Sequence, residues 1–537
     1  MTKYKTLYTI ILIISSINLF SQVREADEKN VRSNLTYMSS DKLKGREPGT
    51  KEDKITAQFI ASKLETYGLK PLIGNDPLVP FQFTLYREKK GRASIKIGRT
   101  TLNEGEDFSV LPISPSADIT GSLIFGENEI GDAVADLKGK VVVIKTTIDS
   151  IPFKVTALRD KGAVAVLFYS NEILNLETRT ENKGISLPVA QISLQTVKRI
   201  SAMQGERVRY KAVIHIVKGT SYNVVMHTGQ QNLSNESILI GAHYDHLGYG
   251  GMGSSSMSQG KKEIHNGADD NASGVAAAME IGRLLAENRS NLKKDIIIAA
   301  FGGEERGLLG SKVVADTLKK LSLTPTLMIN LDMVGRLSDN KLQVGGTGTF
   351  SEADSVIHKN NKYFKFNLAV TREGNGPSDH SSFYSTEVPV LYFTTGVHKQ
   401  YHTPQDDVEL INFPGMVAEI NYISSIINEL ASNSYKPEFI KTASPSSPAR
   451  ANFKVTLGLI PDFTYEVGDG FKVGPVTDGK PAQKGGMLSG DIITAINEKK
   501  ISNIYEYMSR LGELKAGDII QVDIRREGQA MKLTIKL

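Results

Sequence analysis

Acidic and imidazole side chains recur in short glycine-containing loops of this sequence, at positions that suggest a metal site. Each follows an apolar run or opens a helical pattern, and the six candidates are His243, Asp269, Glu304, Glu305, Asp332 and His402. So many carboxylates at buried strand ends need a cationic partner, because isolated charges are costly in a low-dielectric site. Zinc accepts both ligand types, and five such groups can hold two zinc ions if one carboxylate is shared. One glutamate is then free to act as a base.

The neighbouring glutamates can divide these roles between them. Glu304 and Glu305 are adjacent in a predicted extended loop, so their side chains point in different directions. One can bind metal while the other takes a proton from the attacking water and passes it to the leaving amine. Asp245 lies two residues after His243, where its carboxylate could hold the second ring nitrogen of that histidine.

Buried strands position these groups. Apolar runs at Leu239-Ile240 and from Ile296 to Phe301 predict strands that lead to His243 and to the two glutamates, with a helix over 275–285 between them. Two further predicted strands, 327–331 and 388–393, lead to Asp332 and, through a loop, to His402. Alternating strands and helices predict an α/β fold, with a mostly parallel mixed sheet between helices. Ligands of such sheets bind at the carboxyl ends of the strands.

The length of the chain, 537 residues, exceeds what one core supports. The predicted divisions are a signal peptide at 1–22, a first part of the catalytic domain at 23–101, an inserted β-rich domain at 102–218, the catalytic part at 219–433, a linker at 434–450 and a C-terminal β module at 451–537. The inserted domain has no His, Asp and Glu cluster with ligand spacing, so we expect no chemistry there.

The first residues indicate export. Lys3 and Lys5 precede an apolar run from Leu7 to Phe20, and this pattern is typical of a secretory signal peptide. The run is shorter than the roughly 20 clean apolar residues of a membrane anchor, so we expect no membrane span after cleavage and a periplasmic or extracellular location. The absence of cysteine excludes disulfides, and a net charge of +5 without Lys/Arg runs argues against nucleic acid as a partner.

Five short motifs, in this order along the chain, resemble those of the di-zinc aminopeptidase family, which also contains glutamate carboxypeptidase-like enzymes. They are His243-x-Asp245, Gly267 to Gly274, Glu304-Glu305, Asp332 to Gly335, and Tyr401-His402-Thr403-Pro404-x-Asp406. The resemblance implies the zinc exopeptidase fold and two zinc ions per chain. It implies that Asp269 bridges the ions, that His243 and Asp332 complete one site, that Glu305 and His402 complete the other, and that Glu304 is the general base. It also implies a non-proline cis peptide bond between Asp269 and Asp270, whereas Asp270 and Asp406 would orient their neighbours.

The remaining regions carry resemblances of their own. The inserted domain resembles a protease-associated (PA) domain and the last module a PDZ domain, in which the loop from Leu457 to Ile460 could receive a peptide C-terminus. A packing module that steadies the catalytic domain is the alternative. Some relatives carry an oxyanion-stabilising tyrosine within the stretch that corresponds to 372–377, where this chain has none, so Tyr392 and Tyr401 are the remaining candidates. His246 and His265 are expected to be loop residues, and His380 lines the pocket or is structural.

The sequence therefore predicts an exported zinc aminopeptidase that removes N-terminal residues from peptides or proteins with a free N-terminus. A zinc-bridging water would attack the first carbonyl, with Glu304 as base. A dipeptidase or carboxypeptidase of the same fold is an alternative, as is a glutaminyl cyclase-like enzyme with one zinc. A catalytically inactive binding protein would require a lost ligand or base, and none is missing. The preferred N-terminal residue and the oligomeric state stay open.

Overall fold

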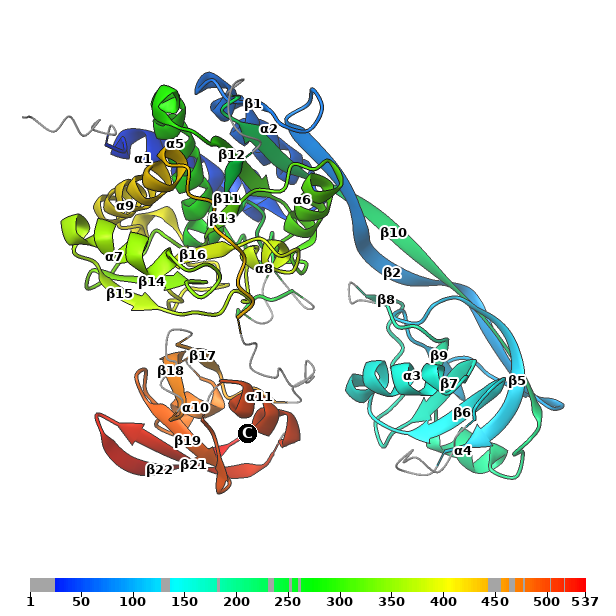
Figure 1. Ribbon diagram of the computed structural model, residues 1–537. Helices are drawn as coiled ribbons and strands as arrows, with labels where there is room; N and C mark the ends of the chain where they lie inside the picture. Colours follow the sequence, from blue (N-terminus) through cyan, green and yellow to red (C-terminus); the bar gives the residue numbers. More distant parts are fainter. Residues whose placement is uncertain are drawn as a thin grey trace, which may run out of the picture.

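The computed structural model describes residues 25–126, 136–180, 184–229, 236–250, 254–258, 262–442, 455–462, 469–476, 479–502, 504–515 and 517–537. The predicted signal peptide and residues 443–450 of the predicted linker lie outside the described residues. Figure 1 shows the catalytic region, a second body at the end of a long two-stranded ribbon, and the C-terminal module.

The catalytic region is built on a mixed sheet whose centre is parallel. Its strand order is β15-β14-β16-β13-β11-β12-β10, in which β11 (Ser237–His243) is parallel to β12 (Asp295–Phe301) and to β13 (Leu327–Leu331), and β13 is parallel to β16 (Val390–Thr394). β15 (Asn367–Val370), β14 (Lys341–Gly345) and β10 (Arg207–His227) form the flanks, and β1 (Lys70–Pro71) pairs with β10. All residues of β11 and β13 are buried, as expected of parallel strands covered on both faces. The predicted α/β fold class is confirmed.

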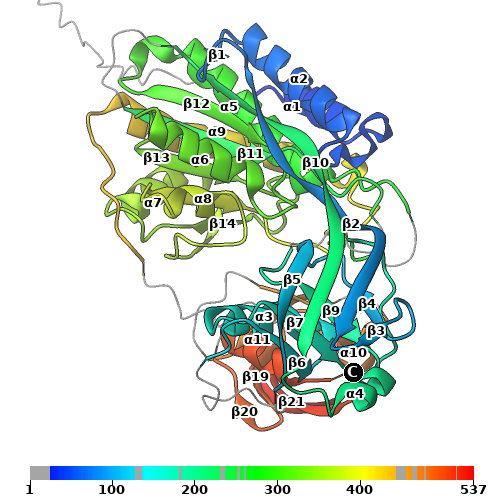
Figure 2. The same ribbon diagram turned by 90° about the vertical axis from the view of Figure 1, so that its right-hand side faces the viewer.

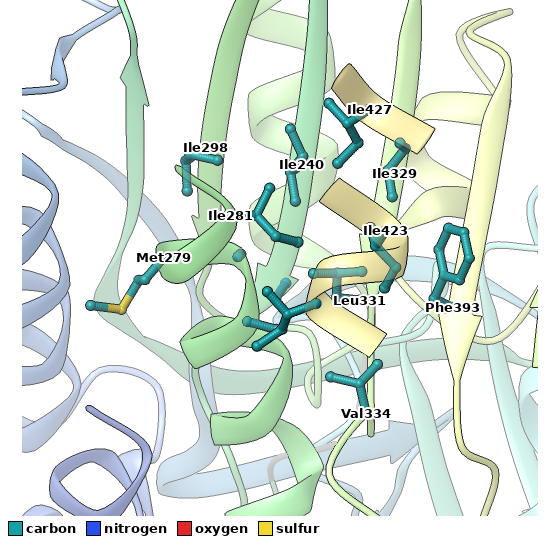
Figure 3. Packing of buried hydrophobic residues seen from close by; sticks show 14 of the residues in the cluster. Ile240, Met279, Ile281, Ile298, Ile329, Leu331, Val334, Phe393, Ile423 and Ile427 are labelled. Carbon is teal, nitrogen blue, oxygen red and sulfur yellow. The ribbon is translucent and has the colours of Figure 1, made fainter. Parts of the chain in front are cut away.

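Alternate residues of these strands face two helical layers. Ile240, Ile298 and Ile329 pack against α5 (Gly274–Glu287) and α9 (Phe413–Ser432), and Figure 3 shows Ile281, Ile423 and Ile427 of those helices meeting them. α1 (Glu28–Met38), α2 (Lys51–Thr66) and α7 (Ala353–Phe364) belong to the same layer. On the opposite face, Leu239, Ile297 and Met328 pack against α6 (Leu309–Lys320) and α8 (His380–Tyr384). The carboxyl ends of the central strands therefore stand together between the two layers.

A long ribbon carries the inserted domain. β2 (Leu78–Ile97) and β10 run antiparallel over most of their length, and Figure 2 shows them leaving the catalytic region side by side. β10 pairs with β5 (Ala117–Phe125) at its start and with β12 at its end, so the predicted boundary at residue 218 falls inside one continuous strand. The inserted domain also contains β3 (Thr100–Leu102), β4 (Phe108–Val110), β6 (Lys140–Lys145), α3 (Ile151–Asp160), β7 (Ala165–Tyr169), β8 (Arg179–Thr180), β9 (Val189–Ile192) and α4 (Leu194–Ile200).

The C-terminal module has a sheet and a core of its own. The strand order is β17-β18-β19-β21-β22, with β20 (Lys499–Lys500) beside β19. The elements are β17 (Leu459–Pro461), β18 (Phe471–Val476), α10 (Pro481–Lys484), β19 (Ile492–Ile496), α11 (Ile504–Glu513), β21 (Ile519–Arg526) and β22 (Gln529–Lys536). β17 is an edge strand of this sheet. Within the described part of the chain, no helix is both long and apolar enough to cross a bilayer.

Candidate metal centre

A first group of ligand atoms forms where β11 and β13 end. His243 is the last residue of β11, and Asp332 directly follows β13 on the adjacent parallel strand. His243 Nε2 lies 3.4 Å from Asp270 Oδ1 and 3.5 Å from Asp332 Oδ1. Two ligands of one tetrahedral zinc, each about 2.0–2.1 Å from the ion, are roughly 3.3 Å apart. The spacing of these three groups, which could hold a metal ion together, therefore fits a single zinc.

A second group shares Asp270 with the first. His402 Nε2 lies 3.2 Å from Asp270 Oδ2 and 3.3 Å from Glu305 Oε1, again the spacing of ligands on one zinc. Each oxygen of the Asp270 carboxylate thus faces a different histidine. An arrangement with one carboxylate between two cation positions is what a two-metal site requires.

The shared carboxylate belongs to Asp270 and not to Asp269, which the resemblance had implied. Asp269 Oδ1 accepts the backbone N–H of Gly335 at 2.7 Å, and its Oδ2 lies 3.2 Å from His398 Nε2. The Asp269 carboxylate therefore holds the loop that follows Asp332 and is turned away from both ligand groups. The cis peptide bond also lies one residue later than expected, between Asp270 and Asn271. A short phrase with two consecutive aspartates cannot show which carboxylate points into the site.

Two imidazoles lie close to the Glu305 carboxylate. His246, expected to be a loop residue, is buried with its Nδ1 2.9 Å from Glu305 Oε1 and 3.8 Å from Asp270 Oδ2, and it forms a possible ligand group with these two carboxylates. His402 matches the zinc spacing better at both contacts, and its Nδ1 lies 3.0 Å from the main-chain oxygen of Ser255. That bond places the proton on Nδ1 and leaves Nε2 free for a metal. Both ring nitrogens of His246 are buried.

The adjacent glutamates differ in their electrostatics. Burial, and then the negative charge of Glu305, raise the pKa of Glu304 well above its usual value, although His243 opposes them. Burial alone would also raise the pKa of Glu305, but His402 and His246 outweigh it and bring that pKa to about 2. Environments that push two titratable groups apart assign them different roles. Glu305 is the anionic partner of the imidazoles, and Glu304 is the group that can hold a proton.

Asp245 acts on the glutamates, whereas the sequence placed its carboxylate on His243. Its Oδ1 accepts the backbone N–H of Glu304 at 3.0 Å and its Oδ2 that of Glu305 at 3.3 Å. The carboxylate is 3.9 Å from His243 Nδ1, which lies instead 3.2 Å from the main-chain oxygen of Asp245. The residue therefore orients the histidine through its backbone and the glutamate loop through its side chain. Spacing in the sequence could not distinguish these two bonds.

Buried polar side chains hold the other ligand loops. Ser378 Oγ donates to Asp332 Oδ2 at 2.6 Å. Asp406 Oδ2 accepts the backbone N–H groups of Asp269 and Asp270 at 3.0 and 2.9 Å, which matches the orienting role expected of Asp406. Hydrogen bonding of this kind fixes ligand geometry and affects metal affinity.

Arg46 is a framework residue that the sequence did not single out. It is fully buried and donates to the main-chain oxygens of Met38, Tyr244, Asn266 and Gly267. It therefore ties the loop after His243 to the loop before Asp270. Burial lowers the pKa of Arg46 to about 10, while the carboxylates of the site raise it. Three of its four partners are far away in the sequence, so local residue order does not show these bonds.

A cavity of about 320 Å³ opens onto the ligand groups. Its lining includes His243, Asp270, Glu304, Asp332 and His402. Tyr392 and Tyr401, the two candidates for oxyanion stabilisation, also line it. Tyr401 stacks on His402 and Tyr392 on His380, with ring centroids 3.8 and 4.6 Å apart. His265 lies outside this lining and bonds to Ser256 and to the main-chain oxygen of Glu263.

Residues 223–425 match Peptidase family M28. This M28 region contains every member of both ligand groups, together with Asp245 and Glu304. A PA domain matches residues 112–200 and a PDZ domain matches residues 451–537. The inserted domain and the C-terminal module thus carry the domain types that their sequences resembled.

Individual relatives cover different shares of the chain. Aminopeptidase YwaD of Bacillus subtilis (strain 168) is 26% identical over 324 residues, 58% of this chain and 66% of that protein. A probable zinc metalloprotease of Pyrenophora tritici-repentis (strain Pt-1C-BFP) is 49% identical over 69 residues, 13% of this chain and 15% of that protein. An aminopeptidase structure from Aneurinibacillus sp. strain AM-1 aligns with 24% identity and a TM-score of 0.49, over 79% of this chain and 98% of that chain.

The chain thus spans just under two thirds of the first relative's length and a small part of the second's. These matches support hydrolase activity of a zinc-dependent peptidase for the M28 region. None of the three names refers to glutamate carboxypeptidase, so that part of the resemblance stays an expectation.

Proposed function

We propose that the chain is a zinc aminopeptidase that removes N-terminal residues from peptides or proteins with a free N-terminus. The observation that carries the proposal is the Asp270 carboxylate, whose oxygens lie 3.4 Å from His243 Nε2 and 3.2 Å from His402 Nε2. Both distances suit a carboxylate that shares an ion with each imidazole, and they suit two zinc ions per chain.

Burial and charge support the same reading. Glu305 Oε1 is buried, and it lies 2.9 Å from His246 Nδ1 and 3.3 Å from His402 Nε2. Burial would lower the pKa of His243 and of His402, but Asp332 and Glu305 respectively outweigh it, and both pKa values rise well above the usual range. The site strongly favours positive charge, and its imidazoles can donate to a metal in their neutral form. Both properties fit a divalent cation.

The residues would be used as follows. His243, Asp270 and Asp332 would hold one ion, and Asp270, Glu305 and His402 would hold the other. Zinc bound there supplies a water of lowered pKa and polarises the substrate carbonyl. Glu304 lies on the cavity wall, and burial and the charge of Glu305 raise its pKa, so its carboxylate would accept a proton from the attacking water. It then returns the proton to the amine that leaves. Asp245 keeps the Glu304 backbone in place.

Adjacent variants Glu304→Gln and Glu305→Gln test this assignment. We expect Glu304→Gln to keep both zinc ions and to lose turnover by at least about 100-fold, because only a proton acceptor is removed. Glu305→Gln removes a ligand and should lose one zinc. Zinc counted per chain, together with hydrolysis of aminoacyl-nitroanilides and their N-acetylated counterparts, separates the two. Activity retained in Glu304→Gln would exclude it as the base.

The alternatives are distinguished by the same measurements. Two bound zinc ions without cleavage of free-amine nitroanilides would favour a dipeptidase or carboxypeptidase. One zinc would favour a glutaminyl cyclase-like enzyme, and none would favour a binding protein. Export to the periplasm or medium rests on residues 1–22 alone, and N-terminal sequencing of the mature protein checks it.

A further inference from the structure

One wall of the cavity comes from a different domain. Leu459, the first residue of β17 in the C-terminal module, lines the cavity that His243, Glu304 and His402 also line. The other described lining residues belong to the catalytic region. The PDZ-matching module is therefore in contact with the space that a substrate of the metal centre would occupy.

The described lining of the cavity is largely apolar. The large apolar and aromatic members of the lining are Met257, Met333, Tyr392, Val397, Tyr401 and Leu459. Among the described residues, no lysine, arginine or carboxylate lines the cavity apart from Asp270, Glu304 and Asp332 at the metal centre. The volume, about 320 Å³, is at the small end of the range for ligand cavities. Such a space suits one apolar side chain next to the reacting atoms.

Contacts before the module and within it reach the catalytic region. Before the module, Thr442 N donates to Tyr384 Oη at 2.9 Å, and Gly374 N donates to Thr442 Oγ1 at 3.1 Å. Gly374 is three residues before Pro377, which lines the cavity. Within the module, Asp462 Oδ2 lies 3.9 Å from Lys341 Nζ of β14 in the catalytic sheet. Thr442, the last described residue before the module, thus contacts a loop that leads to the cavity lining.

We propose that Leu459 completes the pocket for the substrate's N-terminal side chain, so that the C-terminal module selects substrates with an apolar first residue such as leucine or methionine. This proposal rests on the aminopeptidase function proposed above. Removing the leucine side chain opens one wall, which weakens the binding of large apolar side chains and has little effect on a small one.

The first test uses the full zinc-loaded chain and two matched leucine variants. Leu488 is in the same module, is 53% exposed and does not line the cavity. We expect the wild type to cleave leucyl- and methionyl-nitroanilide at least about tenfold better, in kcat/KM, than the glutamyl and lysyl substrates. Leu459→Ala should lower kcat/KM for leucyl-nitroanilide by about tenfold and leave alanyl-nitroanilide within about twofold. Leu488→Ala should match the wild type with every substrate. Identical selectivity in Leu459→Ala and the wild type would overturn the proposal.

A second readout needs no activity. The chain contains no tryptophan, so Leu459→Trp and Leu488→Trp each introduce a single emitter. Titration with L-leucinol, which carries the amine and side chain of an N-terminal leucine, should shift the emission of Leu459→Trp only. If the wild type cleaves no free-amine substrate but Leu459→Trp responds, the aminopeptidase function fails and the pocket assignment stands. If the enzyme is active and only Leu488→Trp responds, or neither does, the role of Leu459 is wrong.

Discussion

The carboxylate of Asp245 accepts the backbone N–H of Glu304 at 3.0 Å, and its second oxygen accepts that of Glu305. Asp245→Asn replaces one of these acceptors by an N–H₂ group that faces an N–H. We expect zinc affinity and kcat each to fall by about 10–100-fold, as is usual when a partner of the ligands is lost. Zinc affinity by competition with a chelator checks this. Asp107→Asn, in the inserted domain, is the control and should change neither.

The two aspartates of the Gly267 to Gly274 phrase should respond differently to the same substitution. Asp270→Asn removes the carboxylate shared by both ligand groups, so we expect it to weaken both zinc sites by more than about 100-fold. Asp269→Asn alters contacts to Gly335 and His398 and should keep two zinc ions per chain. Metal analysis after dialysis at fixed free zinc decides between them. Loss of zinc in Asp269→Asn alone would restore the residue that the resemblance implied.

The two imidazoles near Glu305 can be separated in the same way. His402→Ala should lose the second zinc, because His402 Nε2 has the ligand spacing to both Asp270 and Glu305. His246→Ala should retain it with an affinity within about tenfold of the wild type, because the close contact that it removes is to Glu305 and its distance to Asp270 is 3.8 Å. The opposite result would make His246 the ligand.

Arg46→Ala should destabilise the protein strongly. It leaves four main-chain oxygens, three of them buried, without this donor, and each buried unsatisfied group costs about 1–3 kcal/mol. We expect a loss of more than about 3 kcal/mol in the free energy of unfolding, measured with urea. Lysine should not rescue it, because its three donors lack the planar geometry of the guanidinium. Arg159→Ala, in an exposed pair with Asp160, should cost less than about 1 kcal/mol.

Asp53 should make stability fall as pH rises from about 4 to 6. Burial raises its pKa to about 6, although hydrogen bonds from Tyr244, Gly49 and Ser221 lower it. A raised folded-state pKa stabilises the fold fully below the unfolded pKa, and this contribution is lost as pH passes through the folded value. Relative to Asp53→Asn, the wild type should therefore lose roughly 3 kcal/mol between pH 4 and pH 7.

Urea unfolding in the presence of a chelator measures this difference without interference from zinc. Asp107→Asn is the opposite control. The pKa of Asp107 is lowered, since its bonds to Arg199, Asn103 and Thr196 outweigh burial, so its contribution should be lost as pH falls. A flat difference between wild type and Asp53→Asn would show that Asp53 ionises normally.

Sequence patterns were sufficient to predict the strands and the helix that carry the site. Continuous apolar runs predicted β11, β12 and β13, and periodic spacing predicted α5. Burial of a strand on both faces gives a continuous apolar run, and burial of a helix on one face gives apolar residues at helical spacing. These strands brought His243, Glu305, Asp332 and the distant His402 together as expected.

The sequence alone determined which side chains of this protein can bind metal or carry protons, and at which strand ends they lie. Tertiary structure decided which of two consecutive aspartates faces the cations, that Asp245 supports the glutamates, that His246 enters the site, and that Arg46 ties two ligand loops together. It also placed Leu459 at the cavity, although every ligand-group residue other than His402 lies over a hundred residues earlier in the sequence. The physical reason is common to all of these: side-chain direction and long-range contact depend on how separate segments pack, and local residue order carries no record of that.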